Sequence, residues 1–287
     1  MAERGDPYNL SCLMSSLHKE ATACFGALPV DEHSTFSPVE FRTMLRQHLQ
    51  ISNPAVTANP PLLCACKKQM DNLNRLVSCC KCQNHLTINV HNEVQRVLAE
   101  LASASKTQCT VKVRKMYEAL NPGVNKEADL IMDGALAVDV RISAVGSKEI
   151  TMRTAAQPDY TVLRGEREKR SQYNVVKDQT MFQLVPFVVD SQGHMGPEAK
   201  GLFSKLCHRV AFSSNIPISI IQSYWMRKLS CRLMKAIARR AISKVEMALS
   251  LQLSHNFAYN GVHQSDSIRH VVVDSLSGMS PRDSDYW

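Results

Sequence analysis

Long apolar runs are missing from this sequence. Its most apolar stretches are broken by charged residues every three or four positions, and none approaches the roughly 18 apolar residues that a membrane span requires. The first residues include Glu3, Arg4 and Asp6, and no apolar segment of a secretory signal follows them. We therefore expect no membrane partner and an intracellular location, with the nucleus as one candidate. In this reducing environment the ten cysteines would not form a disulfide scaffold.

The chain is long enough to bury one sizeable core with additional segments around it, since it has 287 residues and 44% apolar content. Its formal net charge is +8 and its isoelectric point is about 9.0. This charge favours a polyanionic partner, and nucleic acid in particular. The alternative is a basic protein without such a partner.

The pattern of apolar residues changes between helical and strand spacing along the chain. A capping box of Ser37, Pro38 and Glu40 predicts a helix over 37–49, and three prolines predict a linker over 52–62. The next expected elements are a helix, three strands, a helix, a strand and two helices: 88–104, 110–113, 128–132, 136–142, 163–178, 182–190, 197–210 and 217–252.

This order predicts an α/β fold with a small mixed sheet in an α-β-β-β-α-β core, preceded by a cysteine-rich segment and followed by helices. We expect an N-terminal helical segment with a linker, the cysteine-rich segment, the core, a basic helix and a largely disordered polar tail: 1–60, 61–87, 88–212, 213–254 and 255–287.

Two aspartates lie in neighbouring predicted strands. Asp139 and Arg141 share one face of their strand, because side chains alternate along a strand. Asp129 falls on the same face only if the connection through Asp133 and Gly134 has an odd number of residues, and a two-residue turn would separate the aspartates. With an odd-length connection, we expect the two carboxylates within about 4 to 8 Å of each other.

Two carboxylates that close repel each other unless a positive charge lies between them. Mg²⁺ or Mn²⁺ prefers oxygen ligands, lowers the pKa of a bound water and neutralises charge on a phosphate. We therefore expect Asp129 and Asp139 to share such an ion. The alternative is that they are ordinary aspartates at strand ends, where this residue often forms turns.

These motifs resemble a known family of nucleases. The order of elements, with aspartates in EADLIM and LAVDVRI, is similar to the restriction-enzyme-like, or PD-(D/E)xK, endonuclease fold. With the cysteine cluster, VHNEV, EKRSQY and FVVDSQGHMGPEA, the chain resembles the C-terminal region of non-LTR retrotransposon polyproteins over about residues 40–245. In those polyproteins this region follows the reverse transcriptase and nicks target DNA.

The resemblance implies roles for single residues. Asp129 and Asp139 match the two acidic positions of the family, and Arg141 stands where its simplest members have a lysine. In the retroelement branch a lysine and a tyrosine on the following helix take part, which correspond to Lys169 and Tyr173. These residues would position water or phosphate.

The first helix of the core also matches the retroelement branch. His91 and Asn92 correspond to a similar pair there, and Glu93 beside them could reach the metal. Two departures from the family pattern concern charge. Arg141 stays protonated, so it could act only electrostatically, and Gln172 occupies a position that is often basic.

Thiols and one imidazole are concentrated before the core, at Cys64, Cys66, Cys79, Cys80, Cys82 and His85. Thiolates and imidazoles are the ligands that tetrahedral Zn²⁺ selects. The resembling family has a further histidine where this sequence has Leu76. Four ligands can still be assembled from Cys64, Cys66, one of Cys79 or Cys80, and Cys82 or His85. The alternative is a group of reduced, half-buried thiols without zinc.

The segment from residue 227 to 245 has no acidic residue and predicts an amphipathic helix, with a ridge of apolar residues repeating every four positions. Its basic residues are Arg227, Lys228, Arg232, Lys235, Arg239, Arg240 and Lys244. A cationic face of this kind favours phosphate binding. A calmodulin-like partner, an anionic membrane surface or a solvated face without any partner would give the same pattern.

Two functions follow as hypotheses. The first is a metal-dependent endonuclease domain of retroelement origin that hydrolyses a phosphodiester in DNA, with RNA as a further substrate class. The second is a non-catalytic nucleic-acid-binding or assembly module on the same fold. The absence of the zinc histidine and of the simple strand lysine favours the second, whereas the two aspartates favour the first.

Overall fold

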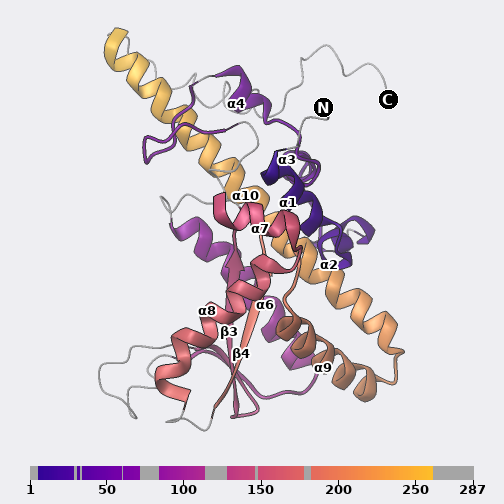
Figure 1. Cartoon of the computed structure of the whole chain (residues 1–287). Helices are drawn as coiled ribbons and strands as arrows, with labels where there is room; N and C mark the ends of the chain where they lie inside the picture. Colours follow the sequence, from indigo (N-terminus) through magenta and orange to yellow (C-terminus); the bar gives the residue numbers. More distant parts are fainter. Residues whose placement is uncertain are drawn as a thin grey trace.

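The computed structural model describes residues 6–28, 31–32, 34–59, 61–71, 84–113, 128–145, 148–177 and 182–260. These residues form an α/β fold in which helices surround a mixed sheet of four strands (Figure 1). The expected fold class and the small mixed sheet are therefore confirmed.

The helices are α1 (Pro7–Ser16), α2 (Lys19–Thr22), the 3₁₀-helix η1 (Ala23–Gly26), α3 (Pro38–Leu49), α4 (Pro54–Ala58), α6 (Asn84–Ala104), α7 (Lys148–Ala156), α8 (Tyr160–Lys177), α9 (Pro197–Ser214) and α10 (Ile218–Asn260). The strands are β1 (Cys109–Val113), β2 (Ala128–Met132), β3 (Leu136–Ser143) and β4 (Gln183–Asp190). In the described part of the chain, no helix is both long and apolar enough to cross a membrane.

The strands lie in the order β1-β2-β3-β4. The first three are antiparallel neighbours, and β4 is parallel to β3, so the chain crosses over between them through α7 and α8. The predicted sequence of a helix, three strands, a helix and a strand is confirmed, with α7 as an additional helix. The parallel β3 and β4 need this long connection, because a tight turn joins only antiparallel strands.

The connection between β2 and β3 consists of the three residues Asp133, Gly134 and Ala135. The first two have positive φ angles of 49° and 67°, which aspartate tolerates and glycine favours. Leu130 pairs with Val138 in this register, and continuing it by one position places Asp129 opposite Asp139. The connection is therefore of odd length, as the shared face of the two aspartates requires.

One face of the sheet is covered by α6 and α9, on which α10 packs in turn, and this side contains the main core. Leu130, Val138 and Phe187 of the strands are fully buried there. The other face is covered by α8, which packs on β3 and β4. Gly165 allows this close approach, since a Cβ atom on it would lie 2.7 Å from Val188 Cγ1 and 2.8 Å from Ser143 Oγ.

The segments before the core are more structured than predicted. The capping box at Ser37 is confirmed, because Ser37 and Glu40 exchange side-chain to backbone hydrogen bonds at the start of α3. The expected linker contains the short helix α4, which Asn53 caps through a hydrogen bond to the N–H of Ala55. Helix α10 also continues past His255 to Asn260, while residues 261–287 of the expected tail lie outside the described residues.

Helix α10 does not present the cationic face that the sequence predicted. It runs through the whole molecule (Figure 1) and packs against α3, η1, α6 and α9, so it has neighbours on several sides. The structure buries Arg232, Lys235, Arg240 and Lys244, half-buries Lys228, and leaves Arg227 and Arg239 exposed. The expectation of a solvent-facing basic helix is therefore wrong.

Several charges of α10 are neutralised inside the fold. Glu100 of α6 contacts Lys228 Nζ at 2.8 Å and Arg232 Nη1 at 2.9 Å. Glu40 of α3 contacts Arg239 Nε at 2.5 Å. Lys235 donates to backbone carbonyl oxygens near the start of α3 at 2.5 and 2.6 Å. These basic residues hold helices together, because a buried charge must be paired or hydrogen-bonded.

Candidate metal and catalytic site

The two aspartates lie where β2 and β3 begin to separate. Asp129 Oδ2 accepts a hydrogen bond of 2.7 Å from the backbone N–H of Val140, the residue after Asp139. The Asp129 side chain keeps 22% of its surface exposed and that of Asp139 keeps 7%, so both are largely desolvated. Each carboxylate is close enough to change the pKa of the other. The structure thus brings the predicted pair together.

Helix α8 supplies Lys169 and Tyr173 from above this face of the sheet. The Lys169 Nζ atom contacts both oxygens of Asp139, at 2.8 and 2.9 Å. The buried Tyr173, one helical turn further, hydrogen-bonds the same carboxylate and lowers its pKa. The spacing of four residues puts both side chains on one face of α8. Both predicted helix residues therefore meet Asp139.

Helix α6 supplies His91 from the other side. His91 Nε2 lies 2.9 Å from Asp129 Oδ2, and its Nδ1 lies 3.5 Å from the amide oxygen of Asn92. Gln95, one turn further along α6, is buried and donates a 2.7 Å hydrogen bond to the backbone carbonyl of Asp129. Sequence reasoning missed Gln95, although its spacing of four from His91 indicates the same helix face.

The two aspartates differ in their titration. Burial raises the pKa of Asp139, and the negative charge of Asp129 adds to this, so that the nearby Lys169 does not fully offset the increase. Burial also acts on Asp129, but the hydrogen bond and charge of His91 and the N–H of Val140 outweigh it and lower its pKa. A positive charge placed between the two carboxylates would therefore favour the ionised form of Asp139.

The pKa of the His91 imidazole is shifted upward, whereas that of its partner Asp129 is shifted downward. Burial lowers the pKa of His91, but the hydrogen bond to Asp129 and the charge of that carboxylate outweigh burial and raise it above its ordinary value. His91 therefore donates to Asp129 and favours its ionised form. In this way α6 holds the Asp129 carboxylate in one orientation.

Arg141 lies beside the aspartates but has another partner. Its guanidinium contacts the carboxylate of Glu168, which also accepts a 2.6 Å hydrogen bond from Arg164 Nε. Glu168 is the neighbour of Lys169 on α8, so this network lies next to the site. Arg141 is thus two positions from Asp139 on the same face of β3, and no described bond joins the two side chains. The role expected for Arg141 is electrostatic.

Glu93 is not at the aspartates, so the structure does not place this expected ligand near the metal. Its carboxylate pairs with Arg96, and it lies 4.0 Å from Arg232 Nη1 of α10. Glu93 is two residues from both His91 and Gln95, and two residues turn a helix by more than half of a circle. The same geometry that brings His91 to Asp129 therefore directs Glu93 toward α10.

The expected zinc cluster lies only partly within the described residues. Cys64 is buried and Cys66 is half-buried. Cys64 begins a tight turn, since its carbonyl accepts the N–H of Lys67 at 2.7 Å and its N–H donates to the Lys68 carbonyl at 2.9 Å. His85 is exposed in the first turn of α6. Cys79, Cys80 and Cys82 lie outside the described residues.

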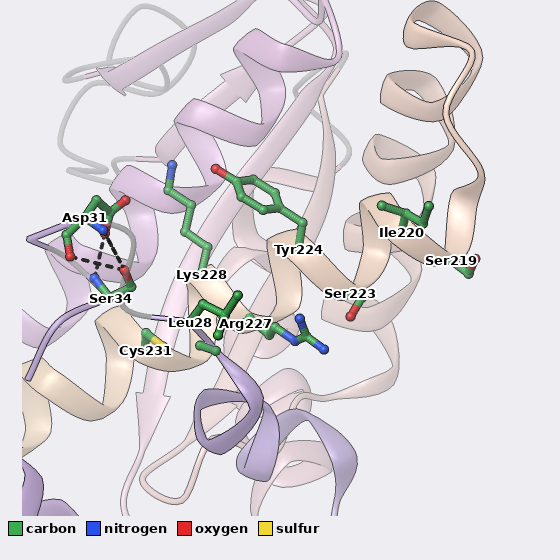
Figure 2. Close-up of a pocket in the computed structure, with 11 residues that line it drawn as sticks. Leu28, Asp31, Ser34, Ser219, Ile220, Ser223, Tyr224, Arg227, Lys228 and Cys231 are labelled. Atoms are coloured by element: carbon green, nitrogen blue, oxygen red, sulfur yellow. Dashed lines mark hydrogen bonds between the residues drawn. The ribbon is translucent and has the colours of Figure 1, made fainter.

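A cavity of about 540 Å³ lies between the segment after η1 and the first half of α10 (Figure 2). Its lining is mostly apolar and includes Leu28, Ile220 and Tyr224, with Arg227 and Lys228 at its polar edge. None of the aspartate-site residues lines it. This cavity is therefore separate from the aspartate pair.

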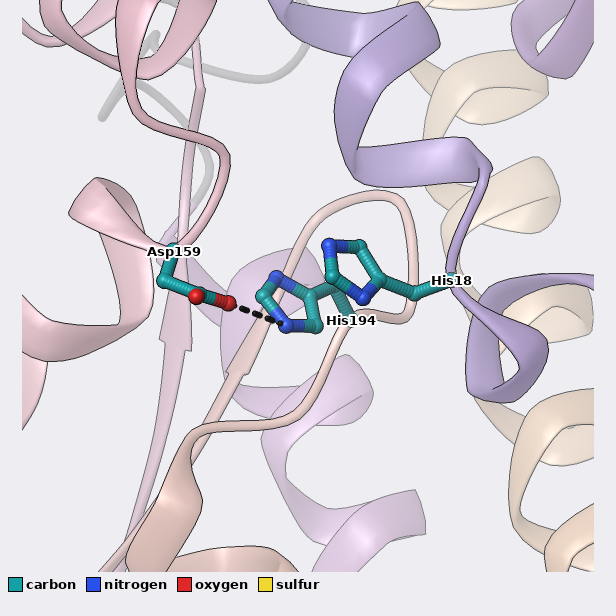
Figure 3. Close-up of side chains that lie close together, drawn as sticks. All are labelled: His18, Asp159 and His194. Atoms are coloured by element: carbon teal, nitrogen blue, oxygen red, sulfur yellow. Dashed lines mark ion pairs between the residues drawn. The ribbon is translucent and has the colours of Figure 1, made fainter.

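A second group of metal-binding residue types lies at the far end of the sheet. His18, Asp159 and His194 come within 4.8 Å of one another, counting one ligand atom from each (Figure 3). Sequence reasoning missed this group, because its members are far apart in the chain and form no spaced motif. The described residues therefore include a cluster that could hold a metal ion.

Comparison with known proteins leaves the function to be argued from this geometry. No protein-family model matches the sequence, and no curated protein matches it.

Proposed function

We propose that this protein is a metal-dependent nuclease with a restriction-endonuclease-like core, which hydrolyses phosphodiester bonds in DNA. The observation that carries the proposal is the assembly around Asp129 and Asp139. Two carboxylates from adjacent strands face each other, and a lysine from the following helix contacts one of them. This is the arrangement that the resemblance to nucleases of non-LTR retrotransposons predicted from separate segments of the sequence.

The donor set fits a hard divalent ion. Asp129 and Asp139 offer carboxylate oxygens, which Mg²⁺ and Mn²⁺ prefer to nitrogen or sulfur. The raised pKa of Asp139 arises from burial and from the charge of Asp129, so positive charge between the two would relieve an existing repulsion. When bound there, the ion would supply Lewis acidity toward a phosphate oxygen and a more acidic water.

The protein side chains would orient the reacting groups. His91 and the Val140 N–H fix the Asp129 carboxylate, and Tyr173 fixes that of Asp139. Lys169, which now donates to both Asp139 oxygens, would stabilise negative charge on the scissile phosphate or hold the attacking water. Arg141 would add positive potential from the neighbouring position on β3.

The nucleic acid would approach along α8 and not along α10. Arg167 is exposed on α8, close in sequence to Lys169, and Arg170 is exposed there as well but pairs with Glu198 of α9. Most basic residues of α10 are instead committed to contacts inside the fold, which removes the surface that the sequence suggested. An approach along α8 would bring the phosphate backbone over the aspartates, and RNA would present the same phosphates as DNA.

A non-catalytic binding module is the second candidate. It is favoured by the direct contacts of Lys169 with Asp139 and of His91 with Asp129, because both carboxylates already have an internal partner. In that case the same residues would form a structural network under a nucleic-acid-binding surface.

Incubation of the purified protein with supercoiled plasmid and Mg²⁺ or Mn²⁺ tests the two candidates. The nuclease proposal expects metal-dependent nicking that Asp139→Asn and Asp129→Asn reduce by on the order of 100-fold or more. Asp133→Asn is the matched control in the same hairpin, since asparagine also tolerates a positive φ angle.

Three results would be informative. Loss of nicking in Asp139→Asn and Asp129→Asn, with retention in Asp133→Asn, supports catalysis at the aspartate pair. Plasmid binding without any nicking in the wild type supports the binding module. Equal nicking by all variants would contradict catalysis at this site and point to a contaminating nuclease.

A further inference from the structure

The cluster of His18, Asp159 and His194 joins three separate parts of the chain (Figure 3). His18 is the N-cap residue of α2, Asp159 lies between α7 and α8, and His194 lies in the loop between β4 and α9. The cluster is distinct from the aspartate pair. Asp190, next to the cluster, pairs with Ser143 at the end of β3. Ser143 is four positions along the strand from Asp139, a separation of about 13 Å.

His194 is a fully buried imidazole with unused hydrogen-bonding capacity. Neither of its ring nitrogens has a partner in hydrogen-bonding geometry. Nε2 nevertheless faces Asp159, with 3.1 Å to Oδ1. Buried polar atoms without hydrogen-bond partners are rare in folded proteins, so these ring nitrogens have capacity to bind a ligand.

His18 covers the His194 ring from the other side. The two imidazoles are stacked, with 3.5 Å between their centroids and an angle of 6° between their planes. His18 is half-buried at the start of a short helix, and one of its ring nitrogens already lies within 4.8 Å of ligand atoms of His194 and Asp159. Asp159 is 52% exposed and has similar freedom to move.

Asp190 supports His194 from behind. Its Oδ1 accepts hydrogen bonds from the N–H groups of Gln192 and His194, at 2.8 and 3.0 Å, which fixes the carboxylate. Its Oδ2 is buried and lies 3.9 Å from His194 Nδ1. A metal-binding histidine commonly directs its second ring nitrogen to a carboxylate, which sets its tautomer and orientation. Asp190 lies on the side of His194 away from the cluster and is positioned to take this role once the ring shifts by less than about 1 Å toward it.

We propose that His18, Asp159 and His194 bind a divalent transition metal, Zn²⁺ by preference, with Asp190 orienting His194. Two imidazoles and one carboxylate suit zinc and leave a fourth position for water. The set differs from the all-oxygen donors of Asp129 and Asp139, which suit Mg²⁺ or Mn²⁺. Since the three ligands come from three segments, zinc would fasten α1 and α2 to the sheet and stabilise the fold.

The test uses the full chain stripped of metal and then titrated with Zn²⁺, with calorimetry and thermal unfolding as readouts. We expect zinc to raise the melting temperature of the wild type. His18→Ala and Asp159→Asn should each weaken zinc binding at this site at least tenfold and remove most of the thermal shift. His208→Ala is the matched control, because His208 is an exposed histidine on α9.

The cysteine cluster is distinguished by replacing zinc with Co²⁺. A site of nitrogen and oxygen ligands gives cobalt d–d absorption without thiolate-to-cobalt charge transfer. This thiolate-free signal should disappear in His18→Ala and persist in His208→Ala. Variants at Asp129 and Asp139 should leave zinc binding unchanged, so the zinc proposal stands or falls separately from the nuclease.

Two outcomes would overturn the zinc proposal. The first is a wild-type protein whose melting temperature and calorimetric trace do not respond to zinc. The second is zinc binding that His18→Ala and Asp159→Asn leave unchanged, or cobalt spectra that show only thiolate ligands. Cobalt spectra with thiolate charge transfer alone would assign the bound metal to cysteines.

Discussion

At the scale of single residues, Asp129 and Asp139 are chemically identical side chains that the fold makes different. His91 and the Val140 N–H stabilise the charged form of Asp129, whereas deeper burial opposes the charged form of Asp139. Lys169 is the one described cation in contact with Asp139. Its ammonium therefore offsets the carboxylate charge and is also available to a phosphate.

The first residue-scale prediction concerns Lys169. Lys169→Met should reduce plasmid nicking by on the order of 100-fold, because it removes the positive charge next to the reacting phosphate. Lys169→Arg should retain more activity than Lys169→Met, since it keeps the charge but changes its geometry. Lys205→Met, at an exposed lysine of α9, is the control. Nicking rates at saturating Mg²⁺ measure the effect, and equal rates for Lys169→Met and the control would contradict it.

At the scale of elements, α8 contacts both the sheet and the start of α9. Gly165 lets α8 approach β3 and β4, and Glu166 accepts a 2.9 Å hydrogen bond from the N–H of Glu198 in the first turn of α9. The N-cap residue of α9, Gly196, has no side chain to make such a bond. A carboxylate from another helix therefore caps α9, where the helix dipole favours negative charge.

A pair of glycine variants tests this cap. A Cβ atom on Gly196 would lie 2.2 Å from Glu166 Oε1, whereas one on Gly201 would meet nothing within 4 Å. Gly196→Ala should lower the free energy of unfolding by about 1 to 3 kcal/mol, because Glu166 must move away. Gly201→Ala should raise it by roughly 0.5 to 1 kcal/mol, as alanine favours a helix. Urea denaturation measures both, and effects of the same sign would contradict the cap.

At the scale of the whole molecule, α10 packs on both the main core and the N-terminal segments, which the sequence predicted as separate parts of the chain. Its first half belongs to the main core with α6 and α9, and its second half packs on α4 and the Cys64 turn. Glu40 forms an ion pair with Arg239 of this helix, and Glu100 forms one with Arg232. Acidic residues of α3 and α6 thus hold the N-terminal segments and the core on one long helix.

This arrangement predicts acid-sensitive stability through Glu40. Burial raises the pKa of Glu40, but the Ser37 N–H and Arg239 outweigh it and hold the pKa below its ordinary value of 4.5. A carboxyl whose pKa is lower in the folded state stabilises the fold above its unfolded pKa and loses this effect as the pH falls through the folded pKa. The contribution is therefore complete at neutral pH.

Glu40→Gln should lower the free energy of unfolding at pH 7 by about 2 kcal/mol, because Arg239 loses its partner and the cap loses its charge. The difference from the wild type should shrink as the pH falls below about 4.5. Glu149→Gln, at an exposed residue, should change stability by less than about 0.5 kcal/mol. Urea denaturation as a function of pH measures this, and a pH-independent difference would contradict the assignment to the Glu40 charge.

The sequence by itself determined the local features. Period-two alternation set which residues share a face within each strand, and helical spacing set the common face of Lys169 and Tyr173, whereas the odd length of the β2–β3 connection came from the structure. The capping box fixed the start of α3. These features depend on covalent geometry and on residues a few positions apart, so they can be predicted without knowledge of distant contacts.

Only the tertiary structure decided which surfaces are exposed and which distant residues meet. Arg232 of α10 is buried where α6 supplies Glu100 as its partner, which no pattern within α10 reveals. Glu93 and Gln95 are both near His91 in sequence, but the packing angle of α6 selects Gln95 for Asp129. The meeting of His18, Asp159 and His194 likewise depends on how the chain crosses the sheet, because long-range packing and not sequence spacing sets their distances.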